Sequence, residues 1–321
     1  MPKTEQAKIV SPQSFMQQLL ANELNINNLR SNALLRKDEW KEFDTTVVEV
    51  TRQRLNGIAD LQSRGLTLSL GGLGTLVSQY EAQSDMEDAE INMAGVTPGE
   101  EDSIEFDIRS VPIPIIHKDF RINIRRLEAS RKLGDSVDTT QSAVAGRRVS
   151  DKMEDMLFNG AGITVDGNTI PGYTNATGIT TGSLSTWDHS TNQGNIYGDI
   201  LDMIQDAHDA HYYGPFVVYI ASNRWQYLLG VYDDGSGQTP LQRILNIPGI
   251  EEVKASDVLS DNTALMVQMT RDVVDLAVAQ DVTTVQWDSQ GGMQVHFKVM
   301  AALAPRVKRD YNGNTGIVYY S

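Results

Sequence analysis

Opposite charges occupy adjacent segments of this 321-residue chain. No Lys or Arg occurs from Gly65 to Ile108, a stretch that holds ten acidic residues. The next segment, Arg109 to Lys132, carries seven basic residues against two acidic ones. Both segments can be ordinary solvated faces. Alternatively, the acidic segment of one subunit lies on the basic segment of the next, because complementary patches set the register between partners and symmetric assembly lets one sequence supply both.

The overall composition excludes several classes of protein. The 42 acidic and 27 basic residues give a net charge of −15, which argues against a protein whose main task is to grip phosphate backbones. Without cysteine there is no disulfide framework, thiolate nucleophile or cysteine-bound metal. The first twenty residues lack a signal-peptide pattern, and no apolar run approaches the roughly 18 residues that span a bilayer. We therefore expect a soluble protein without a membrane partner.

One long helix is predicted from Asp138 to Phe158. Asp138 and Gln141 have the spacing of a capping box, and Asn159-Gly160 is a typical helix stop. Apolar residues between them recur every three or four positions and form one stripe. At about 1.5 Å per residue, this helix is roughly 30 Å long and can form the spine of an elongated subunit.

The segment before this helix has the alternation of β-strands. A strand is predicted over Thr46–Gln53 and another over Ser103–Ile116, with the same period of two continuing to Ile124. Pro112 and Pro114 place the second strand at an edge or on an exposed ribbon. The second strand and its continuation to Ile124 together indicate a long, two-stranded excursion outside the core. The Gly-rich run 71–74 is interpreted as the hinge at its root.

The second half of the chain mixes helices and strands. A helix near 196–212 precedes a strand over Phe216–Ala221, and Ser222 is predicted to cap a helix at 225–230. Further strands are expected between Met293 and Ser321. Because strands and helices do not alternate regularly, the fold class is α+β rather than a doubly wound sheet.

No motif for catalysis, cofactor binding or metal binding stands out. His208 and His211 are three residues apart but lack a third ligand, so an exposed helix face is the better interpretation. The acidic residues of the same helix, from Asp199 to Asp209, are interpreted as its solvated side. The run 233–237, DDGSG, lacks the acid spacing of a calcium loop and is read as a turn. We predict no enzyme activity.

The segment from Ser110 to Asn175 resembles tailed-phage major capsid proteins and the related encapsulin shell proteins. A strand pair leads through a basic connection into the long helix, whose end reads EDMLFNG at 154–160, followed by IPGY at 170–173. Two later passages also resemble that family, GPFVVY at 214–219 and LQRILNIPGIEEV at 241–253. The resemblance covers most of residues 100–321.

This resemblance implies the Hong Kong 97-type capsid fold and a division of the chain into five parts. These are an N-terminal arm (1–45), an extended loop with supporting strands (46–128), a peripheral domain with the spine helix at about 138–158 (129–195), an axial domain (196–285) and C-terminal strands (286–321).

The same resemblance implies that the two charged segments meet in a contact between subunits. The acidic loop of one subunit is expected to rest on basic residues of its neighbour. The expected acidic partners are Glu87, Asp88, Glu90, Glu100, Glu101 and Asp102. The expected basic partners are Lys118, Arg121, Arg125, Arg126, Arg131, Lys132, Arg147 and Arg148. Each exposed pair contributes only about 0.2 to 1 kcal/mol, so the effect depends on repetition over many subunits.

The implied function is that of a non-enzymatic major capsid protein without cofactors. Copies of the chain would form the hexamers and pentamers of an icosahedral head that encloses phage double-stranded DNA, assembled in the host cytoplasm and present in the virion. A separate scaffolding protein, a portal and a decoration protein are the further partners expected. No Lys occurs between Lys41 and Lys118, so lysine cross-linking through the loop is not expected. An encapsulin compartment that holds enzymes is the alternative, and a free soluble enzyme or binding domain is the remaining one.

Overall fold

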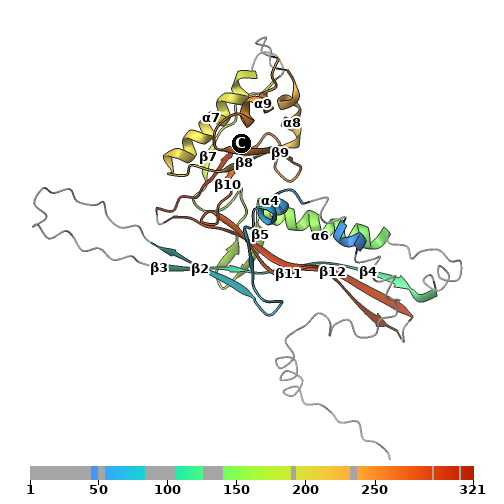
Figure 1. The fold of residues 1–321 in the computed structure, drawn as a ribbon. Coiled ribbons are helices and arrows are strands. Elements are labelled where there is room, and N and C mark those ends of the chain that lie inside the picture. Colours follow the sequence, from blue (N-terminus) through green and yellow to red (C-terminus); the bar gives the residue numbers. More distant parts are fainter. Residues whose placement is uncertain are drawn as a thin grey trace, which may run out of the picture.

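The computed structural model describes residues 45–49, 55–83, 106–125, 140–188, 193–231, 237–290, 293–310 and 312–321. Two β-sheets organise them, and each has helices packed on it (Figure 1). The four-stranded sheet has the order β1-β11-β12-β4, and the five-stranded sheet has the order β7-β13-β10-β8-β9. A separate two-stranded ribbon extends away from the four-stranded sheet (Figure 1). The chain is therefore an elongated α+β protein, as the sequence predicts.

The four-stranded sheet is built on two long antiparallel strands. These are β11 (Val274–Ser289) and β12 (Gln294–Val307). The short strand β1 (Thr67–Ser69) pairs in parallel with β11, and β4 (Ile115–Asn123) pairs antiparallel with β12 at the opposite edge. The strands β12 and β13 lie in the region where the sequence predicts C-terminal strands.

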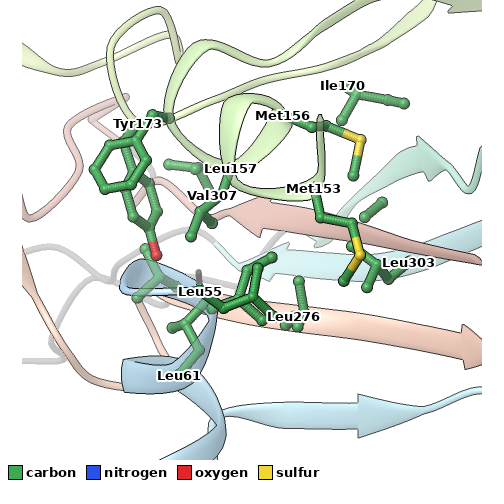
Figure 2. Close-up of a cluster of buried hydrophobic side chains, with 14 of the residues drawn as sticks. Leu55, Leu61, Met153, Met156, Leu157, Ile170, Tyr173, Leu276, Leu303 and Val307 are labelled. Atoms are coloured by element: carbon green, nitrogen blue, oxygen red, sulfur yellow. The ribbon is translucent and has the colours of Figure 1, made fainter. Parts of the chain in front are cut away.

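Helix α6 (Thr140–Asn159) lies along this sheet and agrees closely with the predicted spine helix (Figure 1). Its predicted apolar stripe is buried, from Ala145 to Phe158. In Figure 2, Met153 lies beside Leu303 of β12, Leu157 lies beside Val307 of the same strand, and Met156 lies beside Ile170. Each fully buried side chain of this size contributes roughly 1.5–3 kcal/mol, so the stripe fixes the helix to the sheet.

The end of α6 depends on two glycines. Gly160 has a φ of +73°, and a Cβ on Gly172 would lie 2.2 Å from the Gly160 nitrogen. The backbone of residues 173 and 174 therefore approaches closely enough to donate to the carbonyls of Leu157 and Phe158. These bonds satisfy carbonyls that a helix end would otherwise leave open. The strands β5 (Ala161–Val165) and β6 (Asn168–Ile170) form a hairpin between the two glycines.

The five-stranded sheet carries the second hydrophobic core. Its inner strand β8 (Phe216–Ala221) is buried at all six positions, and its β-branched and aromatic residues favour a strand. The other strands are β7 (Thr180–Gly182), β9 (Ile250–Ser256), β10 (Ala264–Gln268) and β13 (Ile317–Tyr320). The helices α7 (Gln193–Asp209), α8 (Ser222–Leu229) and α9 (Pro240–Leu245) belong to the same unit.

The ribbon consists of β2 (Val77–Gln83) and β3 (Phe106–Pro112). The sequence correctly predicts that the segment of β3 lies on an exposed ribbon, but it pairs the wrong segments. The partner of β3 is β2, which the sequence does not predict as a strand, and the continuation to Ile124 belongs to β4, which joins the four-stranded sheet. The Gly run lies between β1 and β2, with Gly71 and Gly72 at positive φ, so it marks the root of the ribbon.

Two local predictions are wrong. Residues 45–49 are helical rather than the start of a strand, because Val47 is buried in the main core on one helical turn. Ser222 is the first residue of α8 and not its cap, since Ala221 occupies the cap position and the Ser222 hydroxyl donates to Asp257. Tertiary contacts override the local preference in both cases.

Candidate assembly surfaces

The root of the ribbon is fixed to the four-stranded sheet by a buried ion pair. Arg306 of β12 donates from Nε and Nη2 to the two carboxylate oxygens of Asp275 on β11, at 2.5 Å each. Its Nη1 donates to the hydroxyl of Ser78 on β2, 3.1 Å away. Both charged side chains are less than one-tenth exposed. The bidentate pair joins β11 and β12 and holds the Arg306 guanidinium in one orientation, so Ser78 of the ribbon is bonded to a fixed donor of the core sheet.

A groove of about 290 Å³ lies beside this root. We call it the ribbon-root groove, and it runs between β3 and the β5–β6 hairpin. Its lining includes Tyr80, Asp107, Ile108, Arg109, Thr169 and Arg309. Burial raises the pKa of the Tyr80 hydroxyl, so this side chain acts as a neutral hydrogen-bonding group. The groove therefore combines an apolar wall with two guanidinium groups and one carboxylate.

The basic residues predicted from the sequence lie on two elements near each other. Lys118 and Arg121 are exposed on β4, and Arg125 follows that strand. Arg147 and Arg148 are exposed on α6, which packs against β4. Arg126, Arg131 and Lys132 lie outside the described residues, as do all six predicted acidic partners. The contact between these groups therefore stays a prediction.

The two sheets are joined by a buried polar cluster centred on helix α4 (Gly57–Ser63). Asp60 of α4 accepts a hydrogen bond of 2.6 Å from the Tyr219 hydroxyl on β8 and pairs with Lys254 of β9. Glu154 of α6 accepts from the backbone nitrogens of Asn56 and Gly57, at 3.0 and 2.6 Å. One short helix is thus held by the spine helix and by the five-stranded sheet at once.

Burial changes the acidity of Glu154. The side chain is 4% exposed, and the loss of hydration raises the pKa of the carboxyl from 4.5 to about 7. Hydrogen bonds from the α4 backbone favour the charged form, but they offset only part of the effect of burial. The nearby Asp60 carboxylate raises the pKa further. The protonation state of Glu154, which lies at the junction between the two sheets, therefore changes near neutral pH.

The acidic face predicted for α7 is only partly solvated. Asp199 is 5% exposed and accepts hydrogen bonds from the Trp187 indole at 2.7 Å and from the Ser185 backbone at 3.0 Å. Asp206 accepts one from the Tyr320 hydroxyl at 2.7 Å. The prediction of a solvated side is wrong for these residues, which tie α7 to the chain segments beside it.

The two histidines near the end of α7 do not lie on one helix face. Helix α7 ends at Asp209, so His211 lies beyond it with a φ of +64° and does not continue the face of His208. Within the described ranges, no three His, Asp or Glu side chains are grouped closely enough to hold a metal ion. The loop at 233–236 lies outside those ranges. The described helices also include none that is long and apolar enough to cross a membrane.

Comparisons with known proteins give one matching family model and relatives in sequence. A family described as "Family of unknown function (DUF6260)" has a model that matches residues 27–320. The chain is 28% identical over 294 residues to a diheme-cytochrome–encapsulin shell fusion protein of Kuenenia stuttgartiensis, covering 90% of this chain and 73% of that protein. It is 25% identical over 277 residues to the type 1 encapsulin shell protein EncA of Myxococcus xanthus (strain DK1622), covering 85% and 90%.

Solved structures match over a similar length. A virus-like particle from Pyrococcus furiosus aligns with a TM-score of 0.62 at 20% identity, covering 88% of this chain and 99% of that one. The capsid of the myovirus phage XM1 aligns with a TM-score of 0.65 at 13% identity, covering 83% and 92%. The Hong Kong 97-type fold implied by the sequence resemblance is thereby confirmed.

The sequence patterns do not identify the charged side chains that are buried in the fold. Arg306, Asp275 and Asp60 lie in strands or helices whose neighbours in sequence give no sign of their partners, which are 31 to 228 residues away. One signal was available, since Arg306 interrupts the apolar C-terminal strand at a position where a charge needs a partner.

Proposed function

We propose that this chain, which belongs to the family of unknown function DUF6260, is the structural subunit of a closed protein shell. The observation that carries this proposal is the ribbon. It has two strands of seven residues, and neither has a further strand partner within the described part of the chain. Leu76 and Ile108 of the ribbon region are 74% and 63% exposed. A free edge with exposed apolar residues is unfavourable for a monomer but is suited to contact with a neighbour.

The parts of the subunit follow from this role. We assign residues 46–128 to the extended loop and its support, 129–195 to the peripheral domain and 196–285 to the axial domain. The N-terminal arm (1–45) and the C-terminal strands (286–321) complete the subunit. Subunits of one sequence would form pentamers and hexamers through small differences in the pose of arm and loop. The buried ion pair at the ribbon root supports this assignment, because it bonds the ribbon to a fixed donor of the core sheet.

For the content of the shell, we propose packaged double-stranded DNA. A net charge of −15 suits a wall that confines DNA without binding it tightly, since tight binding to phosphates needs a basic surface. A phage head of this kind also requires a portal, and we expect a separate scaffolding protein and a decoration protein as further partners. The virion would then be the final location of the protein.

The second candidate is an encapsulin compartment that encloses enzymes in the cytoplasm. The two named relatives favour it, because one is an encapsulin shell protein and the other is a fusion that contains an encapsulin shell. The two candidates share the subunit fold and the assembly chemistry, and they differ in what the lumen contains.

Two experiments test these proposals in order. The full chain is expressed alone and viewed by electron microscopy, where closed icosahedral particles are expected and a persistent monomer would refute the shell. Particles from cells that naturally encode the chain are then treated with nuclease, and their content is extracted. Protected DNA of uniform length supports the phage head, whereas one enriched enzyme without protected DNA supports the compartment.

A further inference from the structure

We propose that the ribbon-root groove binds the phosphate group of a small organic phosphate ester, with Arg309 as the principal ligand. The inference does not depend on the proposed shell, because every residue that it uses belongs to one chain. The walls of the groove come from separate parts of that chain, which are the strands β2 and β3, the β5–β6 hairpin, the loop at 176–177 and the end of β12 with Arg309.

Arg309 carries the positive charge of the groove that is left without a partner among the described residues. It follows β12 and is half-buried, and its guanidinium forms no ion pair or hydrogen bond with another described side chain. The other lining cation, Arg109, pairs with Asp107 at 3.0 Å, and its Nη1 is covered by protein. Arg109 therefore contributes charge rather than a free donor. Two guanidinium groups and one carboxylate leave one positive charge for an anion.

The residues on either side of Arg309 fix the backbone but do not neutralise its charge. Lys308 pairs with Asp275 at 2.8 Å. The carboxylate of Asp310 accepts from the backbone nitrogen of Asn314 at 2.7 Å, and the nitrogen of Asp310 donates to the Asn314 carbonyl at 2.8 Å. The chain is thus held before and after Arg309, whereas the Arg309 side chain is available to a ligand.

Two threonine hydroxyls line the same groove from other segments. Thr169 lies on β6 and Thr177 in the loop before β7, and neither hydroxyl bonds to another described residue. The loop of Thr177 packs on the turn that follows Arg309, because a Cβ on Gly178 would lie only 1.8 Å from the Gly313 carbonyl oxygen. One guanidinium and two hydroxyls match the three free oxygens of a phosphate ester better than the two oxygens of a carboxylate.

The rest of the lining indicates that the phosphate carries an organic group. Apolar side chains form part of the groove, namely Val111, Pro171, Ala176 and Val307. Ile108 lines the same groove and is 63% exposed. An inorganic phosphate would leave this surface in water, whereas the organic part of an ester would cover it. The volume of about 290 Å³ lies at the lower end of the range for ligand sites, so the ester is of about mononucleotide size or smaller.

Isothermal titration calorimetry on the full-length chain tests the site, with adenosine 5′-monophosphate as the probe. We expect the nucleotide to bind more tightly than inorganic phosphate, which lacks the organic group. Arg309→Gln should weaken nucleotide binding about tenfold or more, the effect of losing one charged hydrogen bond, and Arg309→Lys should restore part of the loss. The matched control is Arg148→Gln, which removes a guanidinium that is 70% exposed on α6 and should leave the affinity unchanged.

A second variant, Thr169→Trp, fills the groove without removing a charge. Thr169 is exposed on the hairpin, so a larger side chain there leaves the core undisturbed. We expect this variant to lose nucleotide binding. Thr181→Trp places the same side chain at an exposed position of β7 in the other sheet and should bind as the wild type does. Circular dichroism shows that each variant is folded before its affinity is measured.

Two results would overturn the site. These are no nucleotide binding at millimolar concentration, and binding that neither Arg309→Gln nor Thr169→Trp weakens. Equal affinity for inorganic phosphate would overturn the assignment of an organic ester. A single-stranded oligonucleotide without terminal phosphates identifies the source of the phosphate. If it displaces the nucleotide, the groove takes a nucleic-acid backbone, and if it does not, the groove takes a free ester; both results support the site. None of these measurements depends on whether the chain forms particles, so they are separate from the test of the shell.

Discussion

The stability of the subunit should depend on one carboxyl group, that of Glu154, between about pH 4.5 and pH 7. In the folded chain its pKa is raised from 4.5 to about 7 by burial. The unfolded chain therefore releases this proton at a lower pH than the folded chain does. In that window folding takes up a proton, so the free energy of unfolding falls as the pH rises through it.

The size of the effect follows from the two pKa values. One unit corresponds to about 1.4 kcal/mol, so the interval from 4.5 to about 7 corresponds to a loss of about 3 kcal/mol. Glu154→Gln removes the titration. The amide oxygen can still accept from the nitrogens of Asn56 and Gly57, at a cost of about 1 kcal/mol for the less suitable amide group. We expect the variant to lose less than about 1 kcal/mol over the same window.

Urea unfolding of the unassembled chain at pH 5, 6, 7 and 8 measures this slope. The matched control is Asp155→Asn, the next residue on the same helix. Hydrogen bonds with Asn159 and Lys152 lower the pKa of Asp155, so its contribution is complete above its unfolded pKa and is lost only as the pH falls below about 4. The control should keep the wild-type slope. If Glu154→Gln also keeps that slope, the assignment of the titration to the α4–α6 junction is wrong.

Three further substitutions test the other features of the fold. Asp275→Asn leaves Arg306 buried without a full counter-charge, and we expect a loss of roughly 3–5 kcal/mol in unfolding free energy by urea titration, with faster proteolysis of the ribbon. Asp199→Asn should change the fluorescence of Trp187 and cost about 1–3 kcal/mol, because a buried acceptor of the indole is altered. Gly172→Ala should give largely insoluble protein, since its Cβ would meet the backbone after α6. An Asp275→Asn variant as stable as wild type, an unchanged fluorescence spectrum or a soluble Gly172→Ala protein would contradict the respective argument.

The fold could be predicted from sequence wherever local periodicity decides the structure. The apolar stripe of α6 and the strand Phe216–Ala221 are both found where the sequence predicts them, because one face of the helix and both faces of the strand must leave water. The strand predicted at Thr46–Gln53 failed because β-branched residues favour a strand only where a sheet is available. Here Val47 finds a place in the core on a single helical turn instead.

The candidate assembly surfaces were harder to predict, because the partners of their buried charged residues lie far away in the sequence. Composition drew attention to exposed basic residues such as Lys118 and Arg121. It gave no reason to separate Arg109 from them, although Arg109 is mostly covered at the ribbon root, with a side chain only 19% exposed. Burial distinguishes a guanidinium that water can solvate from one that needs a partner, and burial is a property of the fold.

This difference yields a last prediction about where neighbouring subunits meet. Arg121 is exposed on β4, and its loss should change the free energy of assembly by no more than about 1 kcal/mol, as for surface ion pairs in general. Arg121→Gln should therefore assemble at less than about five times the wild-type concentration and lose this small effect in high salt. Arg109→Gln should instead lower the urea midpoint of the unassembled subunit, because its guanidinium is largely covered at the ribbon root and pairs with Asp107 of the same strand. An assembly defect of Arg121→Gln that is larger than fivefold, or that persists in high salt, would contradict the argument for an exposed and solvated Arg121.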